Sequence, residues 1–209
     1  MKIERIKIKD KEVEFDKKDQ VVCVVNNSAT YDEIKDFIIF DNERKGDFDS
    51  DLGYFLQKDN FFGEKLDDSK RQEMKNIAEN YFKEISPIEL SGGKKIYFIY
   101  DPDDVFVDFD IKLFNKDSVE LDYYEERENS LTLKLIEFIV VNNVISRWCK
   151  NFSIDCNFPI FISDGFDYIE HENIETIMGL IKTMDKQVFI SLTVKNKKIE
   201  SFCDKVVEI

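Results

Sequence analysis

The chain has 209 residues and a formal net charge of -14, and 43% of its residues are hydrophobic. That hydrophobic share is enough to bury a core, which argues against a disordered chain. The acidic excess argues against a protein that binds DNA through an overall basic surface, because such binding needs clustered Lys and Arg. We expect one α/β domain over residues 1–209.

The cysteine and histidine content predicts no metal site. Four cysteines are scattered without a CxxC pair, and one histidine, His171, accompanies them: Cys23, Cys149, Cys156 and Cys203. Zinc sites draw four ligands from closely spaced Cys and His residues, and this pattern does not supply them. The first residues alternate and carry acid early, unlike a signal peptide, and no apolar run could span a bilayer. We expect a cytoplasmic chain with reduced cysteines and no membrane contact.

The first 93 residues predict a hairpin, a buried strand and two helices. Residues 1–15 alternate between apolar and charged side chains, which predicts two short paired strands. Val21–Val25 is a continuous β-branched run, typical of a strand buried on both faces. Apolar residues at helical spacing predict helices over 31–40 and 67–85, the second ended by Ser86-Pro87. Residues 41–60, rich in Asp, Gly and Asn, are expected to form a loop.

The remaining residues predict three strands, a long helix and a strand–helix–strand–strand ending. The expected strands are 96–100, 105–113, 119–121, 158–162, 187–192 and 202–209, and the long helix covers 129–149. The order of elements favours a mixed sheet with flanking helices and an antiparallel N-terminal portion. Within the expected domain, 1–40 hold the hairpin, 41–93 form a variable helical insert, and 94–209 form a strand lobe and a C-terminal βαβ half.

The end of the strand 158–162 is the most informative point of the chain. Ser163-Asp164-Gly165 follow this apolar run, and a helix and the strand 187–192 come next. An acidic side chain at the end of a buried strand commonly faces the ligand crevice of an open α/β sheet. Asp164 is therefore the one candidate catalytic carboxylate of the chain.

This order resembles the C-terminal half of an ABC-type ATPase head of the SMC/RecF class, with a Walker B strand, a D-loop, a helix, a switch strand and a terminal strand. The resemblance implies a P-loop NTPase-like fold. In such a fold, glycine N–H groups wrap the phosphates, a lysine reaches the outer phosphates, and a Ser or Thr hydroxyl holds Mg²⁺.

The residues at the phosphate-binding positions depart from the family. In the segment after Val25, Asn26 and Ser28 match the family's loop, whereas Thr30 stands at the lysine and Tyr31 at the Mg²⁺-binding hydroxyl. Asn27 lies between the matching residues, and none of the loop's glycines is present. We expect this segment to fail as a phosphate cradle.

The catalytic positions depart from it as well. Ser163 falls at the metal-ordering Asp, Asp164 at the catalytic Glu and Thr193 at the switch His. Shifting the alignment by one residue makes Asp164 the metal-ordering Asp but puts Gly165 at the base. Neither alignment supplies both carboxylates.

Two segments are weighed for the signature motif. Residues 126–130 align with it loosely and lack its Ser-Gly-Gly. The string Leu90-Ser91-Gly92-Gly93 contains those letters but lies upstream, before a strand, so we expect a loop there or a short joint that replaces a coiled coil.

The sequence leaves three functions open. The first is a non-hydrolysing relative of these heads, a pseudo-ATPase without a cofactor, which serves as an assembly or regulatory subunit and offers the dimer face to itself or to a protein partner. The resemblance would place it in DNA repair, chromosome maintenance or phage defence, with DNA contacted only indirectly. The second is a divergent ATPase that uses Asp164 with Mg-ATP. The third is an acidic decoy or binding module for a DNA-binding protein.

Overall fold

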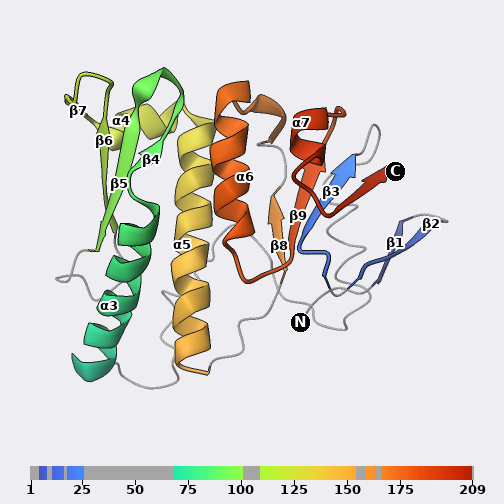
Figure 1. Ribbon diagram of the computed structural model, residues 1–209, viewed down its shortest axis with the longest axis horizontal. Helices are drawn as coiled ribbons and strands as arrows, with labels where there is room; N and C mark the ends of the chain where they lie inside the picture. Colours follow the sequence, from blue (N-terminus) through green and yellow to red (C-terminus); the bar gives the residue numbers. More distant parts are fainter. Residues whose placement is uncertain are drawn as a thin grey trace. The chain divides into compact units, whose positions relative to one another are not determined.

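The computed structural model describes most of the chain in two compact units. Unit 1 comprises Met1–Asp47 and Asn157–Ile209, and unit 2 comprises Phe48–Cys156 (Figure 1). The single domain expected over 1–209 stays a prediction. The residues described here are 5–8, 11–16, 18–25, 68–100, 109–153, 159–162 and 166–208.

A four-stranded parallel sheet forms the centre of unit 1. Its strands lie in the order β10-β3-β9-β8, and all three neighbouring pairs are parallel. Their bounds are β3 (Val21–Val25), β8 (Ile160–Ile162), β9 (Val188–Leu192) and β10 (Lys205–Glu208). β3 is a central strand with all five residues buried, which confirms the interpretation of its β-branched run.

Short elements complete unit 1. β1 (Arg5–Ile8) and β2 (Lys11–Glu14) form the predicted antiparallel hairpin. After β8 come the 3₁₀ turns η2 (Phe166–Tyr168) and η3 (His171–Asn173) and the helix α6 (Ile174–Lys182), which buries Ile177, Met178 and Ile181. The four-residue helix α7 (Lys197–Glu200) was not predicted; the Asn196 side chain caps it by accepting from two backbone N–H groups at 3.1 and 3.3 Å.

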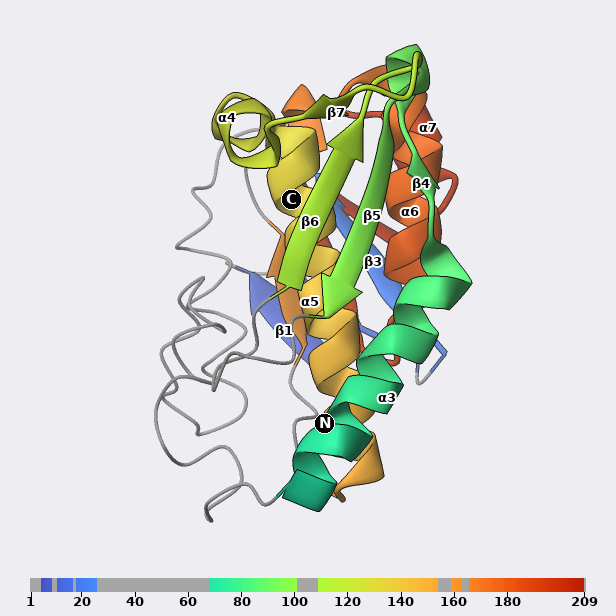
Figure 2. The ribbon, with the colours of Figure 1, turned by 90° about the vertical axis from the view of Figure 1, so that its left-hand side faces the viewer.

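The described residues of unit 2 form an antiparallel sheet and the helices α3, α4 and α5 (Figure 2). The strand order is β4-β5-β6-β7, and every pair is antiparallel. The bounds are α3 (Asp68–Ile85), β4 (Ile88–Glu89), β5 (Lys95–Tyr100), β6 (Phe109–Phe114), β7 (Glu120–Leu121), α4 (Tyr123–Glu128) and α5 (Leu131–Asn151). Parallel and antiparallel sheets with helices confirm the predicted α/β class. In the described residues the two kinds of pairing occur in separate sheets, not in the single mixed sheet that the sequence predicted.

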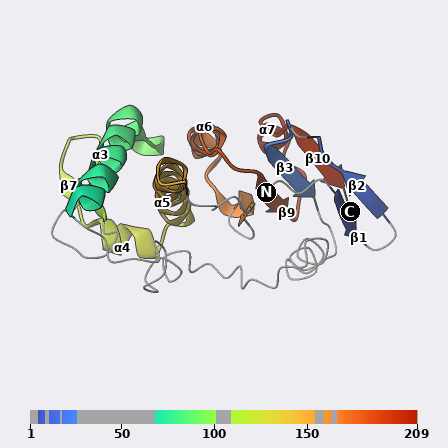
Figure 3. The same cartoon turned by 90° about the horizontal axis from the view of Figure 1, so that it is seen from below.

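The core of unit 2 joins its helices to its sheet. The ring of Phe82 on α3 lies 5.7 Å from that of Phe98 and 5.2 Å from that of Phe109. Trp148 on α5 donates its indole N–H to the carbonyl of Met74 on α3 at 2.9 Å. Figure 3 shows α3 and α5 side by side, which these contacts explain. The buried indole N–H of Trp148 is thus satisfied inside the core.

Several sequence predictions can be compared with these elements. The helices predicted over 67–85 and 129–149 are confirmed as α3 and α5. The helix over 31–40 and the loop over 41–60 lie outside the described residues. α4 was not predicted. Cys23 and Cys203 are free thiols, but Cys149 is disulfide-bonded, so the expectation of a fully reduced chain is wrong at Cys149; Cys156 lies outside the described residues.

Candidate functional site

The carboxyl ends of the parallel strands define the candidate site in unit 1. Val25 of β3 pairs with Leu192 of β9, and Ile162 of β8 pairs with Ile190, so these strands end along one edge. The chain leaving β3 returns as β8, beyond β9, whereas the chain leaving β9 crosses β3 to form β10. Connections that leave two adjacent strands in opposite directions mark the point where open parallel sheets bind ligands. That point lies between the ends of β3 and β9.

A carboxylate and a threonine meet at this edge. Thr193, the first residue after β9, donates both its backbone N–H and its hydroxyl to Oδ2 of Asp167, each at 2.9 Å. Asp167 belongs to η2, which follows β8. The two contacts join the chain segments that leave two neighbouring strands, and they occupy both donors of Thr193.

The orientation of this pair bears on the role predicted for Thr193. The resemblance places Thr193 at the residue that would contact the terminal phosphate, where a donor must point toward the ligand. Here both donors point to a carboxylate, whose negative charge repels phosphate at the same place. Both donors of Thr193 are thus engaged by Asp167 in the described part of this edge.

The other predicted site positions lie outside the described residues. They are Asn26, Asn27, Ser28, Thr30, Tyr31, Ser163 and Asp164. Their roles stay predictions. The structure shows where the chain enters these two segments. β3 ends at Val25 and β8 ends at Ile162, at the same edge of the sheet as Thr193. Sequence reasoning missed Asp167, although an acid so soon after a strand end is the same signal that singled out Asp164.

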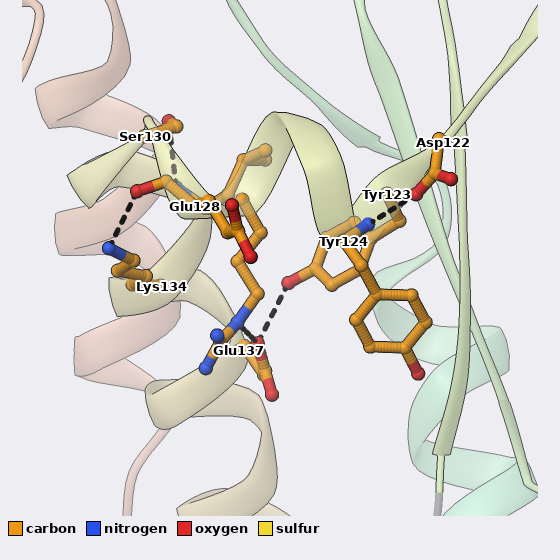
Figure 4. Close-up of polar contacts among 9 residues, drawn as sticks. Asp122, Tyr123, Tyr124, Glu128, Ser130, Lys134 and Glu137 are labelled. Carbon is orange, nitrogen blue, oxygen red and sulfur yellow. Dashed lines mark hydrogen bonds and ion pairs between the residues drawn. The ribbon is translucent and has the colours of Figure 1, made fainter.

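The segment aligned with the signature motif lies at the junction of two helices in unit 2. Residues 126–130 cover the end of α4 and the N-cap of α5. Ser130 accepts from the backbone N–H of Leu133 at 3.3 Å, and Lys134 donates to the carbonyl of Glu128 at 2.9 Å (Figure 4). The serine at this position is therefore a helix cap in this chain.

A polar cluster holds α4 against α5. Glu137 of α5 accepts from the Tyr123 hydroxyl at 2.9 Å and from Nε of Arg127, both on α4 (Figure 4). Burial and the neighbouring Glu137 carboxylate raise the pKa of Tyr123 well above its ordinary value. The phenol therefore stays a proton donor to Glu137, and the cluster joins α4 to α5 within unit 2.

The Leu90–Gly93 string is a hairpin turn. Ser91–Gly93 form the 3₁₀ turn η1 between β4 and β5, which confirms the predicted loop. Gly92 and Gly93 adopt φ values of 71° and 74°, and a Cβ on Gly93 would stand 2.9 Å from Cβ of Lys116. Both glycines are thus explained by backbone geometry.

Within the described ranges, no three or more His, Cys, Asp or Glu side chains gather so that they could hold a metal ion. The helices that the structure describes include none that is both long and apolar enough to cross a membrane.

Comparison with known proteins gives a weak structural similarity. No family model matches the chain, and no curated protein matches it in sequence. Among solved structures, the chain is similar to the SmcHead bound to the C-winged helix domain of ScpA, with a TM-score of 0.41 and 13% identity. The similarity covers 76% of this chain and 50% of the other, so the chain spans about half the length of that structure's chain.

Proposed function

We propose that this chain is an ATPase-head-like subunit that does not hydrolyse ATP and acts in protein assembly. The observation that carries the proposal is the parallel sheet β10-β3-β9-β8, with its ligand-binding point at the ends of β3 and β9. A P-loop belongs after a strand in the position of β3. The segment that follows Val25 has neither the lysine nor the glycines of such a loop.

Two further features support a chain without nucleotide chemistry. The Asp167 carboxylate holds both donors of Thr193 beside the expected phosphate position. The sequence supplies no pair of carboxylates after β8 in either alignment. A head of this kind retains a scaffold that can bind another protein. Chromosome maintenance, DNA repair and defence complexes are the settings that the resemblance implies.

We place the assembly surface at the junction of α4 and α5, the position of the family's signature motif. Tyr124 on α4 is 63% exposed and Leu131, the first residue of α5, is 43% exposed. Two of the charged side chains between them are engaged within unit 2: Glu126 pairs with Lys94 at 2.7 Å, and Arg127 pairs with Glu137. Aromatic and aliphatic side chains held on a rigid support are the usual anchors of protein interfaces.

Isothermal titration of the full chain with Mg-ATP is expected to give no saturable heat. The physical reason is that backbone glycines, the lysine and the magnesium-binding hydroxyl are all replaced at the expected phosphate position. Incubation with Mg-ATP should likewise release no phosphate above the rate of buffer alone.

Saturable micromolar binding of Mg-ATP would contradict this proposal and favour the divergent ATPase. Loss of that binding in Asp164→Asn would then identify the carboxylate that uses the metal. Binding without phosphate release would retain the head-like scaffold and contradict the loss of the phosphate cradle.

The double substitution Tyr124→Glu with Leu131→Glu is expected to abolish capture of a specific partner by the tagged chain in an extract of its native host. Both changes introduce charge at exposed apolar positions, so they should leave the fold intact. The measurement compares bands retained by wild type and by the variant at equal loading.

A matched control for that experiment is Val194→Glu, which also places a charge on an exposed apolar residue, 67% exposed, but in unit 1. Capture that is unchanged in the α4–α5 variant, or equally lost in the control, would exclude the α4–α5 junction as the assembly surface.

A further inference from the structure

An open groove lies in unit 2 along β5 and the C-terminal half of α3, in a part of the chain that the proposed function does not use. Its volume is about 600 Å³, within the range of specific ligand sites. Figure 2 shows α3 beside the end of β5. The residues that line it are Glu79, Phe82, Lys83, Ser86, Lys95, Tyr97, Phe98, Ile99, Tyr100, Lys112, Phe114 and Ser118.

One wall of the groove is the edge of β5. Four consecutive residues of this strand, 97–100, line it, and β4 pairs only with Lys95 and Ile96. The next residue that would donate to β5 is Ser86, opposite Phe98. The ladder does not continue past β4, because the N–H of Ser86 already donates to the carbonyl of Phe82 at 2.9 Å. Among the described residues, the β5 edge from 97 to 100 therefore has no strand partner.

The pairing pattern shows which backbone groups point into the groove. The N–H of Leu90 donates to the carbonyl of Lys94 at 2.9 Å, so Lys94 faces β4. Direction alternates along an antiparallel strand, so the backbone N–H and C=O of Phe98 and Tyr100 face the same side. An extended peptide laid along this edge would find two donors and two acceptors at strand spacing.

The other wall is one face of α3. Glu79, Phe82, Lys83 and Ser86 recur at intervals of three, four and seven residues, which is one helical stripe. The hydroxyl oxygen of Ser86 is buried and has no hydrogen-bond partner among the described residues.

The charge of the groove is opposite to that of the whole chain. Three lysines and one glutamate line it, although the chain carries a net charge of -14. Lys95 and Lys112 reach Glu89 and Glu120 at 3.5 and 3.9 Å in exposed ion pairs. Exposed pairs contribute little, so carboxylates of a ligand can replace those partners.

We infer that this groove binds an acidic, extended peptide segment of a partner protein, which adds as a strand to the open edge of β5. Backbone hydrogen bonds to Phe98 and Tyr100 would provide affinity, and the three lysines would select acidic side chains. Alternate apolar side chains of the peptide would pack on Tyr97 and Phe114, whose rings lie 5.6 Å apart. The inference does not depend on the proposed function, because no residue of the parallel sheet lines the groove.

Fluorescence anisotropy of the full chain with a fluorescein-labelled peptide of alternating Glu and Val tests this site. Saturable binding is expected, and the matching Lys and Val peptide should bind at least roughly tenfold more weakly because its charge is reversed. N-methylation of every internal amide of the Glu and Val peptide should lower its affinity roughly tenfold or more, since the peptide can no longer donate hydrogen bonds to the β5 edge.

Lys83→Glu should weaken binding of the Glu and Val peptide roughly fivefold. Lys197→Glu, the same charge reversal at an exposed lysine of unit 1, should leave binding unchanged. Absence of binding by every peptide would overturn the inference, as would equal binding of the Lys and Val peptide or of the N-methylated peptide. Binding of a labelled single-stranded oligonucleotide in place of the peptide would assign the groove to nucleic acid and overturn it too.

Discussion

Replacement of Trp148 by alanine is expected to lower the free energy of unfolding by about 3–5 kcal/mol. The side chain is fully buried, with 0% of its surface exposed, and its ring lies 6.4 Å from that of Phe109. Truncation of the Trp148 side chain leaves a cavity between α5 and the sheet of unit 2. It also leaves the carbonyl of Met74 without the indole N–H that donates to it at 2.9 Å. Urea titration followed by far-ultraviolet circular dichroism measures the change, because Trp148 is the chain's single tryptophan and fluorescence is lost with it.

Two further variants show which property of the Trp148 side chain accounts for the loss of stability. Trp148→Phe keeps most of the ring and loses the indole N–H, so it separates the hydrogen bond from the cavity. Leu131→Ala truncates an exposed side chain of the same helix and should change stability by less than about 0.5 kcal/mol. Equal shifts for Trp148→Ala and Leu131→Ala would show that α5 does not pack through Trp148.

The sequence predicts best the elements whose apolar side chains recur at a regular spacing or in a continuous run. The β-branched run of β3 has no helical spacing, and its burial follows from its two parallel neighbours. α5 repeats buried apolar residues along most of its length, and α3 does so from Met74 to Phe82. α4 has no such stripe in Tyr-Tyr-Glu-Glu-Arg-Glu. It forms because Asp122 caps it at 3.0 and 3.1 Å and Glu137 holds two of its side chains.

The candidate site was predictable only in part, for a different reason. Thr193 could be placed after a strand by pattern alone. Its partner Asp167 lies 26 residues away, and only the parallel pairing of β8 and β9 brings the two together. The groove depends on β4 having only two residues, because the N–H of Ser86 donates to the carbonyl of Phe82 and does not extend the ladder. The spacing of apolar residues does not show where so short a strand ends. Neither the contact of Thr193 with Asp167 nor the groove could therefore be derived from the sequence.

Lys186→Met is expected to stabilise the protein at pH 7, by at most about 3 kcal/mol. Lys186 lies in the turn before β9, and its side chain is buried, with 6% of the residue exposed. Burial lowers the pKa of this ammonium from 10.5 to about 8, because the charged form loses its hydration. At pH 7 the folded chain must keep a charge at a site that disfavours it, and methionine removes that cost at similar volume.

The advantage of Lys186→Met should depend on pH in a defined direction. Below about pH 8 the lysine is protonated in both the folded and the unfolded chain, so the full cost is present. Between pH 8 and 10.5 the unfolded chain binds more of this proton, so wild type gains stability as the pH rises. Urea midpoints of both proteins should therefore converge near pH 10.5. Lys197→Met, at an exposed lysine, should show neither the stabilisation nor the convergence. A constant difference between wild type and Lys186→Met from pH 7 to 10.5 would mean that the gain comes from packing and that the buried lysine carries no electrostatic cost.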